Sequence, residues 1–434
     1  MARVRPFRAF RYATTSPDVT PLTAPPYDVI NDTQRADLLA RNQHNIVALE
    51  LPDGPLDPSL PGNRYETGAD RWEAWRRQGV LAQDAAPTIY VLEQRWMRGE
   101  TPVRRLAFIV AVGLERFEDG VVLPHERTLP RALDDRLYLT RSCAANFSQV
   151  FGLYSDPLLE TSALLEFATA GEPVEYARGD DEVESRLWAL ADEGPIGEIE
   201  RFFAERQIFI ADGHHRYTTA LAYRDERRAA VAASSSVDEA SDDPSYDYVM
   251  MALANMDDPE LVVLPTHRVA DAEGRFEPEA FWAGLEDRFL IEELPPGHPS
   301  SVLHDNGPPA FIVQTRHARR RLVTLRADVD LDSAITAPYS SAWKHLDVAV
   351  LQELVLSPLL GIHPDWPQTL DRLAFVKDAH EALAMNEPHD AAFILRATRM
   401  QQLREVALAG ETMPQKSTYF YPKLLSGLAL RTLG

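Results

Sequence analysis

Cysteine is almost absent from this 434-residue sequence, in which Cys143 is the only one. A single thiol excludes an intrachain disulfide and a thiolate metal cluster. The residues beside Cys143 are Arg-Ser and Ala-Ala, and without a neighbouring histidine an inert structural thiol is the favoured interpretation. A chain without disulfides is typical of a reducing compartment, so we expect a cytoplasmic protein.

Long apolar runs are also missing. A membrane-spanning helix needs about 18 or more apolar residues, whereas the longest apolar stretch, 351–362, is interrupted by Gln352, Glu353, Ser357 and Pro358. The N-terminus contains several arginines but no apolar core of a signal peptide. We therefore predict no membrane partner.

Positive charge is in the minority, because 66 Asp and Glu outnumber 44 Lys and Arg and give a formal net charge of −22. Such a surface repels nucleic-acid phosphates, so we expect no nucleic-acid partner, but it remains compatible with a local basic pocket for a small phosphate ligand. The apolar fraction of 45% and the charged fraction of 25% are ordinary for a folded globular protein. The length predicts two or three domains at roughly 150 residues each.

The order of predicted helices and strands indicates an α+β, or mixed α/β, fold in three regions. An N-terminal α/β segment at 1–87 is expected to pack on a core at 88–272, and 273–434 forms a further C-terminal α/β region. Within the core, the segment 230–245 is rich in Ala, Ser and Asp and low in complexity, so we expect a mobile loop there.

Three local patterns make specific predictions. The apolar run at 45–51 predicts a short strand. The β-rich runs at 88–94 and 104–113 are expected to pair, with Gly99 in the turn between them. Residues 346–356 predict a long helix.

The segment richest in chemistry follows a predicted buried strand at 208–211. Asp212 and Gly213 suit a tight turn. A helix is expected to begin near His214, because apolar residues from Tyr217 onward recur at helical spacing. The segment therefore predicts a strand, a tight turn and a helix in direct succession.

Three basic residues, His214, His215 and Arg216, occupy the first turn of that helix. Cations there oppose the helix dipole by about 0.3–1 kcal/mol each. The same N-terminus attracts anions, and phosphate is the natural candidate. Adjacent histidines point about 100° apart on a helix and do not easily share one metal ion, so we predict no dedicated metal site. Local capping or packing of the histidines is the weaker alternative.

A second polar motif, at 124–128, directly follows an apolar run and is expected to be a strand end that projects into a cleft. Glu126 suits a general base or a Mg²⁺ ligand, and Arg127 suits a phosphate contact. A surface cluster of salt bridges explains the motif equally well.

Three further segments are candidates. Asp28 follows two prolines in a rigid loop, and His267 and Arg268 follow an apolar strand, where a solvated loop is the stronger interpretation. Lys416 and Lys423 flank hydroxyl and aromatic residues near the C-terminus. Two lysines with hydroxyls suit an anion clamp, although packing of the aromatic tail is the stronger interpretation.

Four motifs in this order resemble the bacterial and archaeal family called domain of unknown function 1015. They are Ala-Pro-Pro-Tyr-Asp-Val-Ile at 24–30, His-Glu-Arg-Thr at 125–128, Ile-Ala-Asp-Gly-His-His-Arg-Tyr at 210–217 and Met-Pro-Gln-Lys-Ser-Thr-Tyr-Phe-Tyr-Pro-Lys at 413–423. The resemblance covers nearly the whole chain. The family name itself implies no chemistry.

A second, shorter resemblance does imply chemistry. Asp-Gly-His-His-Arg at 212–216 is similar to the phosphate-binding box of the ParB/sulfiredoxin superfamily, which includes free-serine kinases. It implies a ParB-like nucleotide-binding core at 88–272, with phosphates held by Gly213, His214 and Arg216. The chain departs from this superfamily in its greater length and in the mid-chain position of the box, so the base of a kinase is not placed by the resemblance.

The resemblance implies transfer of a phosphoryl group from ATP or ADP, with Mg²⁺, to a small hydroxyl metabolite, for which free L-serine is the best single candidate. Such chemistry depends mainly on positioning and charge neutralisation. Asp212 or Glu126 would hold Mg²⁺ or accept the hydroxyl proton, and His215 would offset developing charge. Arg127 and His267 are secondary phosphate contacts.

Asp28, Lys416 and Lys423 are the candidates for contacts to the substrate. Two other functions use the same anion pocket. One is hydrolysis of a phosphate ester such as phosphoserine, and the other is sensing of a nucleotide or metabolite without catalysis. A homo-oligomer is compatible with the sequence, which does not determine the oligomeric state.

Overall fold

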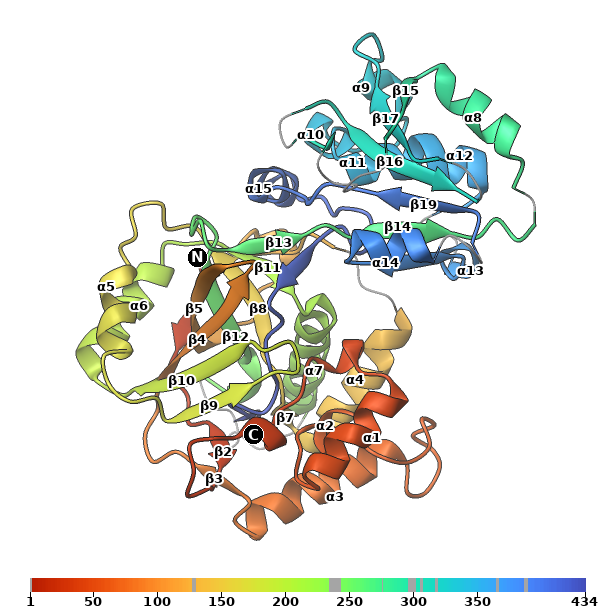
Figure 1. Ribbon diagram of the computed structural model, residues 1–434. Coiled ribbons are helices and arrows are strands. Elements are labelled where there is room, and N and C mark those ends of the chain that lie inside the picture. Colours follow the sequence, from red (N-terminus) through yellow and green to blue (C-terminus); the bar gives the residue numbers. More distant parts are fainter. Residues whose placement is uncertain are drawn as a thin grey trace. The chain divides into compact units, whose positions relative to one another are not determined.

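The computed structural model has a mixed α/β fold. It describes residues 2–126, 130–233, 243–274, 276–295, 302–304, 307–316, 319–363, 367–385 and 389–434. Two compact units make up the fold (Figure 1). Unit 1 comprises Met1–Leu123, Thr128–Leu261 and Pro422–Gly434, and unit 2 comprises Pro124–Arg127 and Val262–Tyr421. Neither unit is continuous in sequence.

Unit 1 is organised around a mixed nine-stranded sheet in the order β6-β11-β8-β12-β5-β4-β10-β9, with β1 paired to the end of β5. The pairs β6/β11 and β8/β12 are parallel, and the other pairs are antiparallel. The strands are β1 (Val4–Arg5), β4 (Ile89–Arg98), β5 (Thr101–Gly113), β6 (Val122–Leu123), β8 (Val150–Tyr154), β9 (Glu175–Arg178), β10 (Glu184–Leu190), β11 (Ile208–Asp212) and β12 (Tyr248–Asn255).

The central strands of this sheet are apolar throughout. All residues of β8 and β12 are buried, as expected for strands covered on both faces. Two small strand pairs add to the unit, β2 (Phe10–Tyr12) with β3 (Leu81–Gln83) and β7 (Ala145–Asn146) with β21 (Arg431–Thr432). Because β1 and β21 both pair within unit 1, the two ends of the sequence belong to the same unit.

The helices of unit 1 pack beside the sheet, with α3 against α4 and α4 against α7 (Figure 1). Their bounds are α1 (Asp32–Arg41), α2 (Val47–Glu50), α3 (Arg64–Arg77), α4 (Pro130–Cys143), α5 (Ser162–Ala168), α6 (Glu193–Phe203) and α7 (His214–Ala233). Short 3-10 turns are η1 (Thr20–Leu22), η2 (Tyr27–Val29), η3 (Phe117–Asp119) and η5 (Ser245–Asp247). The core joins strand residues such as Ile208 to helix residues such as Phe203 and Tyr217.

Unit 2 contains an antiparallel six-stranded sheet in the order β15-β17-β16-β19-β14-β18, and a separate pair of β13 with β20. The strands are β13 (Val262–Leu264), β14 (His267–Ala270), β15 (Phe289–Glu293), β16 (Ala310–Thr315), β17 (Arg321–Leu325), β18 (Leu373–Val376), β19 (Ala391–Ile394) and β20 (Tyr419–Tyr421). The helices are α8 (Pro278–Glu286), α9 (Leu331–Ala334), α10 (Ser341–Lys344), α11 (Asp347–Leu351), the π-helix η7 (Gln352–Leu356), α12 (Ser357–Leu360), α13 (Pro367–Leu370), α14 (Ala379–Ala384) and α15 (Met400–Leu408).

Several local predictions are confirmed. The strands β4 and β5 form the expected antiparallel pair, and Gly99 in the turn between them has a φ of +63°. The strand β11 and the helix α7 have the expected order around Gly213. The predicted long helix at 346–356 is part of a longer helical stretch that includes the π-helix η7.

Two local predictions are wrong. The run at 45–51 is not a strand but contains the helix α2, which follows a turn in which the Asn45 side chain accepts a hydrogen bond from Val47 N. A short apolar run does not distinguish the two states. The predicted mobile loop at 230–245 begins too early, since the alanine-rich end of α7 continues to Ala233. Most of that segment, 234–242, lies outside the described residues.

Unit 1 contains the predicted N-terminal region 1–87 and most of the predicted core at 88–272. It also includes Pro422–Gly434, which the sequence grouped with the C-terminal region. In the described part of the chain, no helix combines the length and the apolarity that crossing a bilayer requires.

Candidate functional site

The strand–turn–helix segment lies in unit 1. The strand β11 ends at Asp212 and α7 begins at His214, so Gly213 alone connects them. Its φ is +88°, a conformation that residues with a side chain rarely adopt. A Cβ atom at Gly213 would also lie 2.8 Å from Arg216 Nε. Glycine therefore serves both the turn and the close packing of the Arg216 guanidinium against it.

Asp212 is surrounded by cations. Lys423 Nζ donates a hydrogen bond to Asp212 Oδ2 at 3.0 Å, and Arg216 Nη2 lies 3.9 Å from the same oxygen. Burial opposes the charge, but attraction to Lys423 and Arg216 outweighs it and holds the pKa of Asp212 well below its usual range. Asp212 therefore stays ionised at neutral pH and is a weak proton acceptor, better suited to orient Lys423 or to bind a cation.

Two arginines add positive charge around Asp212. Arg216 Nη1 donates to the carbonyl oxygen of Gln149. Arg105 is buried, with its guanidinium 4.5 Å from the centre of the Phe151 ring and Nη2 donating to Pro422 O at 2.6 Å. Burial lowers the pKa of Arg105 to about 9, and attraction to Asp212 partly offsets this effect. Three cationic side chains thus face one carboxylate.

We call Asp212, Gly213, His214, Arg216 and Lys423 the α7 cradle. The first backbone hydrogen bond of the helix, from Tyr217 N to Gly213 O at 3.0 Å, places 214–216 in the first turn. Amides in the first turn carry the partial positive charge of the helix dipole. In a protein of net charge −22, this local excess of positive charge favours a bound anion.

The two histidines differ in environment. His214 is buried, whereas His215 is half-buried. Burial lowers the pKa of His215, with Asp28 acting to raise it and Arg216 acting to lower it. His215 is therefore mainly neutral at pH 7, so it offers hydrogen bonds rather than the positive charge that the sequence suggested. Asp28, in the 3-10 turn η2, is exposed.

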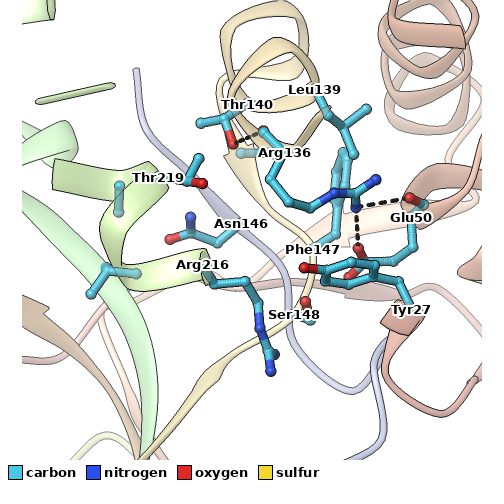
Figure 2. Close-up of a pocket in the computed structure, with 13 residues that line it drawn as sticks. Tyr27, Glu50, Arg136, Leu139, Thr140, Asn146, Phe147, Ser148, Arg216 and Thr219 are labelled. Carbon is cyan, nitrogen blue, oxygen red and sulfur yellow. Dashed lines mark hydrogen bonds and ion pairs between the residues drawn. The ribbon is translucent and has the colours of Figure 1, made fainter. Parts of the chain in front are cut away.

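Arg216 also lines a small cavity bounded by residues of α2, α4 and α7 (Figure 2). Its volume is about 40 Å³, which is enough for a water molecule or one small polar group. Arg136 donates to Glu50 O at 3.0 Å and to Glu50 Oε2 at 3.3 Å, and its guanidinium lies 4.2 Å from the centre of the Tyr27 ring. Among the described residues, buried Glu50 Oε1 and Thr219 Oγ1 have no hydrogen-bond partner. The cavity therefore has unused polar capacity.

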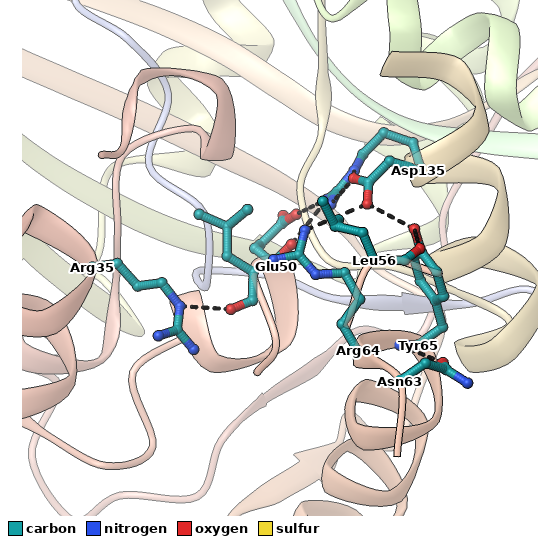
Figure 3. Close-up of polar contacts among 9 residues, drawn as sticks. Arg35, Glu50, Leu56, Asn63, Arg64, Tyr65 and Asp135 are labelled. Atoms are coloured by element: carbon teal, nitrogen blue, oxygen red, sulfur yellow. Dashed lines mark hydrogen bonds and ion pairs between the residues drawn. The ribbon is translucent and has the colours of Figure 1, made fainter. Parts of the chain in front are cut away.

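Contacts with Asp135 hold Arg136, a residue of the cavity wall, in place (Figure 3). Asp135 Oδ2 accepts a hydrogen bond from Arg136 Nε at 2.9 Å, and Asp135 Oδ1 accepts one from the Tyr65 hydroxyl at 3.1 Å. Arg64 Nη1 lies 3.5 Å from Asp135 Oδ1. Burial opposes the charge of Arg136, but Asp135 and Glu50 outweigh it and raise its pKa. Arg136 is thus held as a permanent cation between two carboxylates.

The polar motifs at 124–126 and 413–418, both in unit 2, contact each other. Glu126 Oε1 accepts a hydrogen bond from Lys416 N at 3.0 Å, and Met413 N donates to His125 O at 2.8 Å. His125 Nε2 lies 2.9 Å from Thr418 Oγ1. The segments 124–126 and 413–418, far apart in sequence, are therefore neighbours. Arg127 lies outside the described residues.

His267 and the two lysines have different surroundings from those expected. The solvated loop preferred for His267 is wrong, because its ring is buried in β14 and Nδ1 accepts from Leu395 N at 3.2 Å. Burial lowers the pKa of His267 to about 4, so the ring is neutral, which disfavours its predicted contact to phosphate. Lys416 is an exposed residue of unit 2, whereas Lys423 belongs to unit 1. The lysine patch predicted from sequence therefore divides between the units.

Sequence reasoning missed Arg105, Gln149, Glu50 and Arg136. The charge of Glu50 interrupts an apolar run, and Arg105 directly precedes one, so a signal was available in the sequence. Gln149 and Arg136 carry no such signal, because they reach the site through contacts between distant segments.

The described residues include no group of three or more His, Cys, Asp or Glu side chains that suits a metal ion. Mg²⁺, which the resemblance implies, is usually held by one or two carboxylates together with substrate phosphates. The permanently ionised Asp212 fits this pattern as a single carboxylate ligand beside a phosphate-binding helix end.

No curated protein matches this chain. Among solved structures, it is distantly similar to a conserved hypothetical protein from Pyrococcus furiosus, with TM-score 0.35, 14% identity and coverage of 74% of this chain and 95% of that chain. It is similar to a free serine kinase in complex with AMP at TM-score 0.34 and 14% identity, covering 72% and 86%. SbnI with a C-terminal truncation from Staphylococcus aureus matches at TM-score 0.34 and 10% identity, covering 73% and 85%. At these scores the similarities assign no function.

The family comparison is decisive for membership. The model described as protein of unknown function (DUF1015) matches residues 4–349 of the 434. The motifs at 24–30, 125–128 and 210–217 all fall within this match. This chain therefore belongs to the DUF1015 family, as its motifs predicted.

Proposed function

We propose that this protein is a small-molecule kinase that transfers a phosphoryl group from ATP or ADP to a small hydroxyl metabolite, with free L-serine as the first substrate to test. The observation that carries the proposal is the α7 cradle. Gly213 allows Arg216 to fold back over the helix N-terminus, and Asp212 orients Lys423 beside it. A ParB-like architecture of the surrounding core is part of this proposal.

The cradle suits the phosphates of a nucleotide better than a carboxylate ligand. Helix amides and cations together favour a group with several anionic oxygens. Arg216 presents a planar guanidinium, fixed by Gln149 O, and Lys423 presents an ammonium group. The resemblance of 212–216 to the box of free-serine kinases supports a nucleotide phosphate in particular.

The proposed reaction needs few chemical groups from the protein. The substrate oxygen attacks the terminal phosphorus, the bond from phosphorus to the bridging oxygen breaks, and ADP or AMP leaves. Asp212 would hold Mg²⁺ as its proposed protein ligand, and the ion would supply neutralisation of phosphate charge. Because Asp212 is a weak base, it is not the proposed acceptor of the hydroxyl proton. His215, as a neutral ring, is the proposed hydrogen-bonding partner of the substrate or phosphate.

One assay separates this proposal from its alternatives. The protein is incubated with Mg²⁺, ATP or ADP, and L-serine or a pool of small hydroxyl compounds, and phosphorus NMR follows the phosphate. Formation of a new phosphate ester with loss of the nucleotide's terminal phosphate supports the kinase. Release of phosphate from phosphoserine without a nucleotide supports the hydrolase. Nucleotide binding without turnover supports the sensing role and overturns the proposed reaction.

A further inference from the structure

Unit 2 has a larger pocket that the proposed function does not use. Its volume is about 700 Å³, within the range of about 300–1,000 Å³ that is typical of small-molecule sites. Its lining combines aromatic and apolar residues with polar side chains. The lining residues used below are Tyr339, Trp343, Gln352, Glu353, Met413 and Pro414.

An aromatic platform forms one wall of this pocket. The rings of Tyr339 and Trp343 are stacked, with centroids 4.1 Å apart and planes inclined by 20°. Trp343 Nε1 donates to Thr412 O at 2.9 Å, which fixes the indole. Ser340 N and Ser340 Oγ each donate to the Glu411 carboxylate at 2.6 Å, which fixes the segment between the two rings. A rigid stack of this kind suits a planar ligand, because little side-chain entropy is lost on binding.

Two polar residues of the lining come from a π-helix. Gln352 and Glu353 begin η7, and π-helical turns occur frequently at functional sites. Gln352 Nε2 donates to Ser357 Oγ at 3.1 Å and to Ile362 O at 2.8 Å, so this turn is held in place. Glu353 adds negative charge to the lining, and the described lining residues include no lysine or arginine. His363 also belongs to the lining, but a histidine is not a permanent cation, so the described lining offers no permanent cation to a phosphorylated ligand.

We propose that this pocket is a second binding site, for a planar aromatic compound that carries a positive charge. The ring packs against Tyr339, which is stacked on the buried Trp343, while the cation is attracted by Glu353 and by the Tyr339 ring. Met413 and Pro414 supply apolar contact for the remainder of the ring. The site is distinct from the α7 cradle, since all of its lining belongs to unit 2.

The test uses two probes that share an indole ring and differ in charge. Tryptamine carries an ammonium group, and indole-3-acetate carries a carboxylate. Their affinities for the full-length protein are measured by calorimetry or by ligand-detected NMR. We expect tryptamine to bind about tenfold more tightly than indole-3-acetate, an estimate equivalent to about 1.4 kcal/mol of charge and cation–π attraction. Equal affinities, or tighter binding of the anion, would overturn the proposal.

Variants locate the probe. Tyr339→Ala is expected to weaken tryptamine binding about tenfold, whereas Tyr339→Phe keeps the ring and the affinity. Glu353→Gln is expected to remove the preference for the cation, and it gives an answer even if Tyr339→Ala fails to fold. Trp282→Phe, at an aromatic residue of α8 that stacks with Arg321 outside the pocket, is the control. Tryptamine affinity that survives both Tyr339→Ala and Glu353→Gln places the probe elsewhere and contradicts the site.

Discussion

The two units carry sites of opposite character. At the α7 cradle, Arg216 and Lys423 lie beside one carboxylate, Asp212, which also attracts the buried Arg105. In the pocket of unit 2, aromatic rings and Glu353 form a lining without lysine or arginine among its described residues. The whole chain has a net charge of −22, which agrees in sign with the pocket of unit 2 and not with the α7 cradle. The difference shows that the bulk charge of a chain does not determine the charge of a site made of a few side chains.

The same contrast exists between two carboxylates within unit 1. Asp212 has cations on several sides, and its pKa is depressed. Glu175 in β9 is buried with one ion-pair partner, Arg11, whose Nη1 lies 3.2 Å from Glu175 Oε1. Among the described residues, Glu175 Oε2 has no hydrogen-bond partner. Burial therefore outweighs the attraction to Arg11 and raises the pKa of Glu175 to about 8. The number of neighbouring cations decides whether burial leaves a carboxyl charged.

The largest effect is expected for Arg216→Ala, which tests whether the cationic site of unit 1 binds phosphate. Loss of a charge-assisted contact is expected to weaken ATP or ADP binding by about 2 kcal/mol, or about 30-fold. Arg41→Ala is the matched control, because Arg41 is also in unit 1 and pairs with Asp180 at the surface. Tryptamine binding should be unchanged in both variants. Unchanged nucleotide affinity in Arg216→Ala would contradict the placement of the phosphates.

The next effect concerns Glu175 and tests whether burial outweighs its ion pair with Arg11. The folded protein favours the neutral form of Glu175. The contribution of this group to stability is therefore fully present below its ordinary pKa of 4.5, and it declines as the pH rises through about 8. We expect Glu175→Gln to remove about 2 kcal/mol of that decline. Urea unfolding at pH 5 and pH 8 measures it, with the exposed Glu182→Gln as control. A wild-type stability that rises over this range would show that the charged form of Glu175 is favoured.

Gly213→Ala separates backbone strain from the geometry of the cradle. A φ of +88° is expected to cost about 1–2 kcal/mol of stability for alanine, and the new Cβ displaces the Arg216 guanidinium. Gly79→Ala is the matched control, because Gly79 has a φ of +72° but open space around the added Cβ. Both variants should lower the free energy of unfolding, and only Gly213→Ala should weaken nucleotide binding. Equal nucleotide affinity in the two would show that the position of Arg216 does not matter.

The smallest effect is expected at Cys143, which is useful because it reports on one unit alone. Burial raises the pKa of this thiol to about 12, so the native protein should react very slowly with a thiol reagent at pH 8. Cys143 is the only cysteine in the chain and belongs to unit 1. The labelling rate therefore measures opening of unit 1, and ATP should slow it while tryptamine should not. Rapid labelling of the folded protein would contradict the buried, inert thiol.

The local part of the cradle was predictable from sequence, and its long-range part was not. Asp212 and Gly213 before a helical pattern indicated the turn, since the requirement for glycine depends on neighbouring residues only. Arg105 and Gln149 reach the site through sheet pairing and long-range hydrogen bonds. The prediction of a strand at 45–51 was wrong because a short apolar run suits either a buried strand or a buried helix.

The return of Pro422–Gly434 to unit 1 has a consequence for synthesis on the ribosome. This segment supplies Lys423 to the cradle, β21 to a strand pair with β7, and the carbonyl oxygen of Pro422 to Arg105. All residues of unit 2 are translated before it. A nascent chain therefore has every residue of the aromatic pocket before the cradle obtains its ammonium group. Under the proposed function, nucleotide binding should reach its full strength only after translation has passed residue 423.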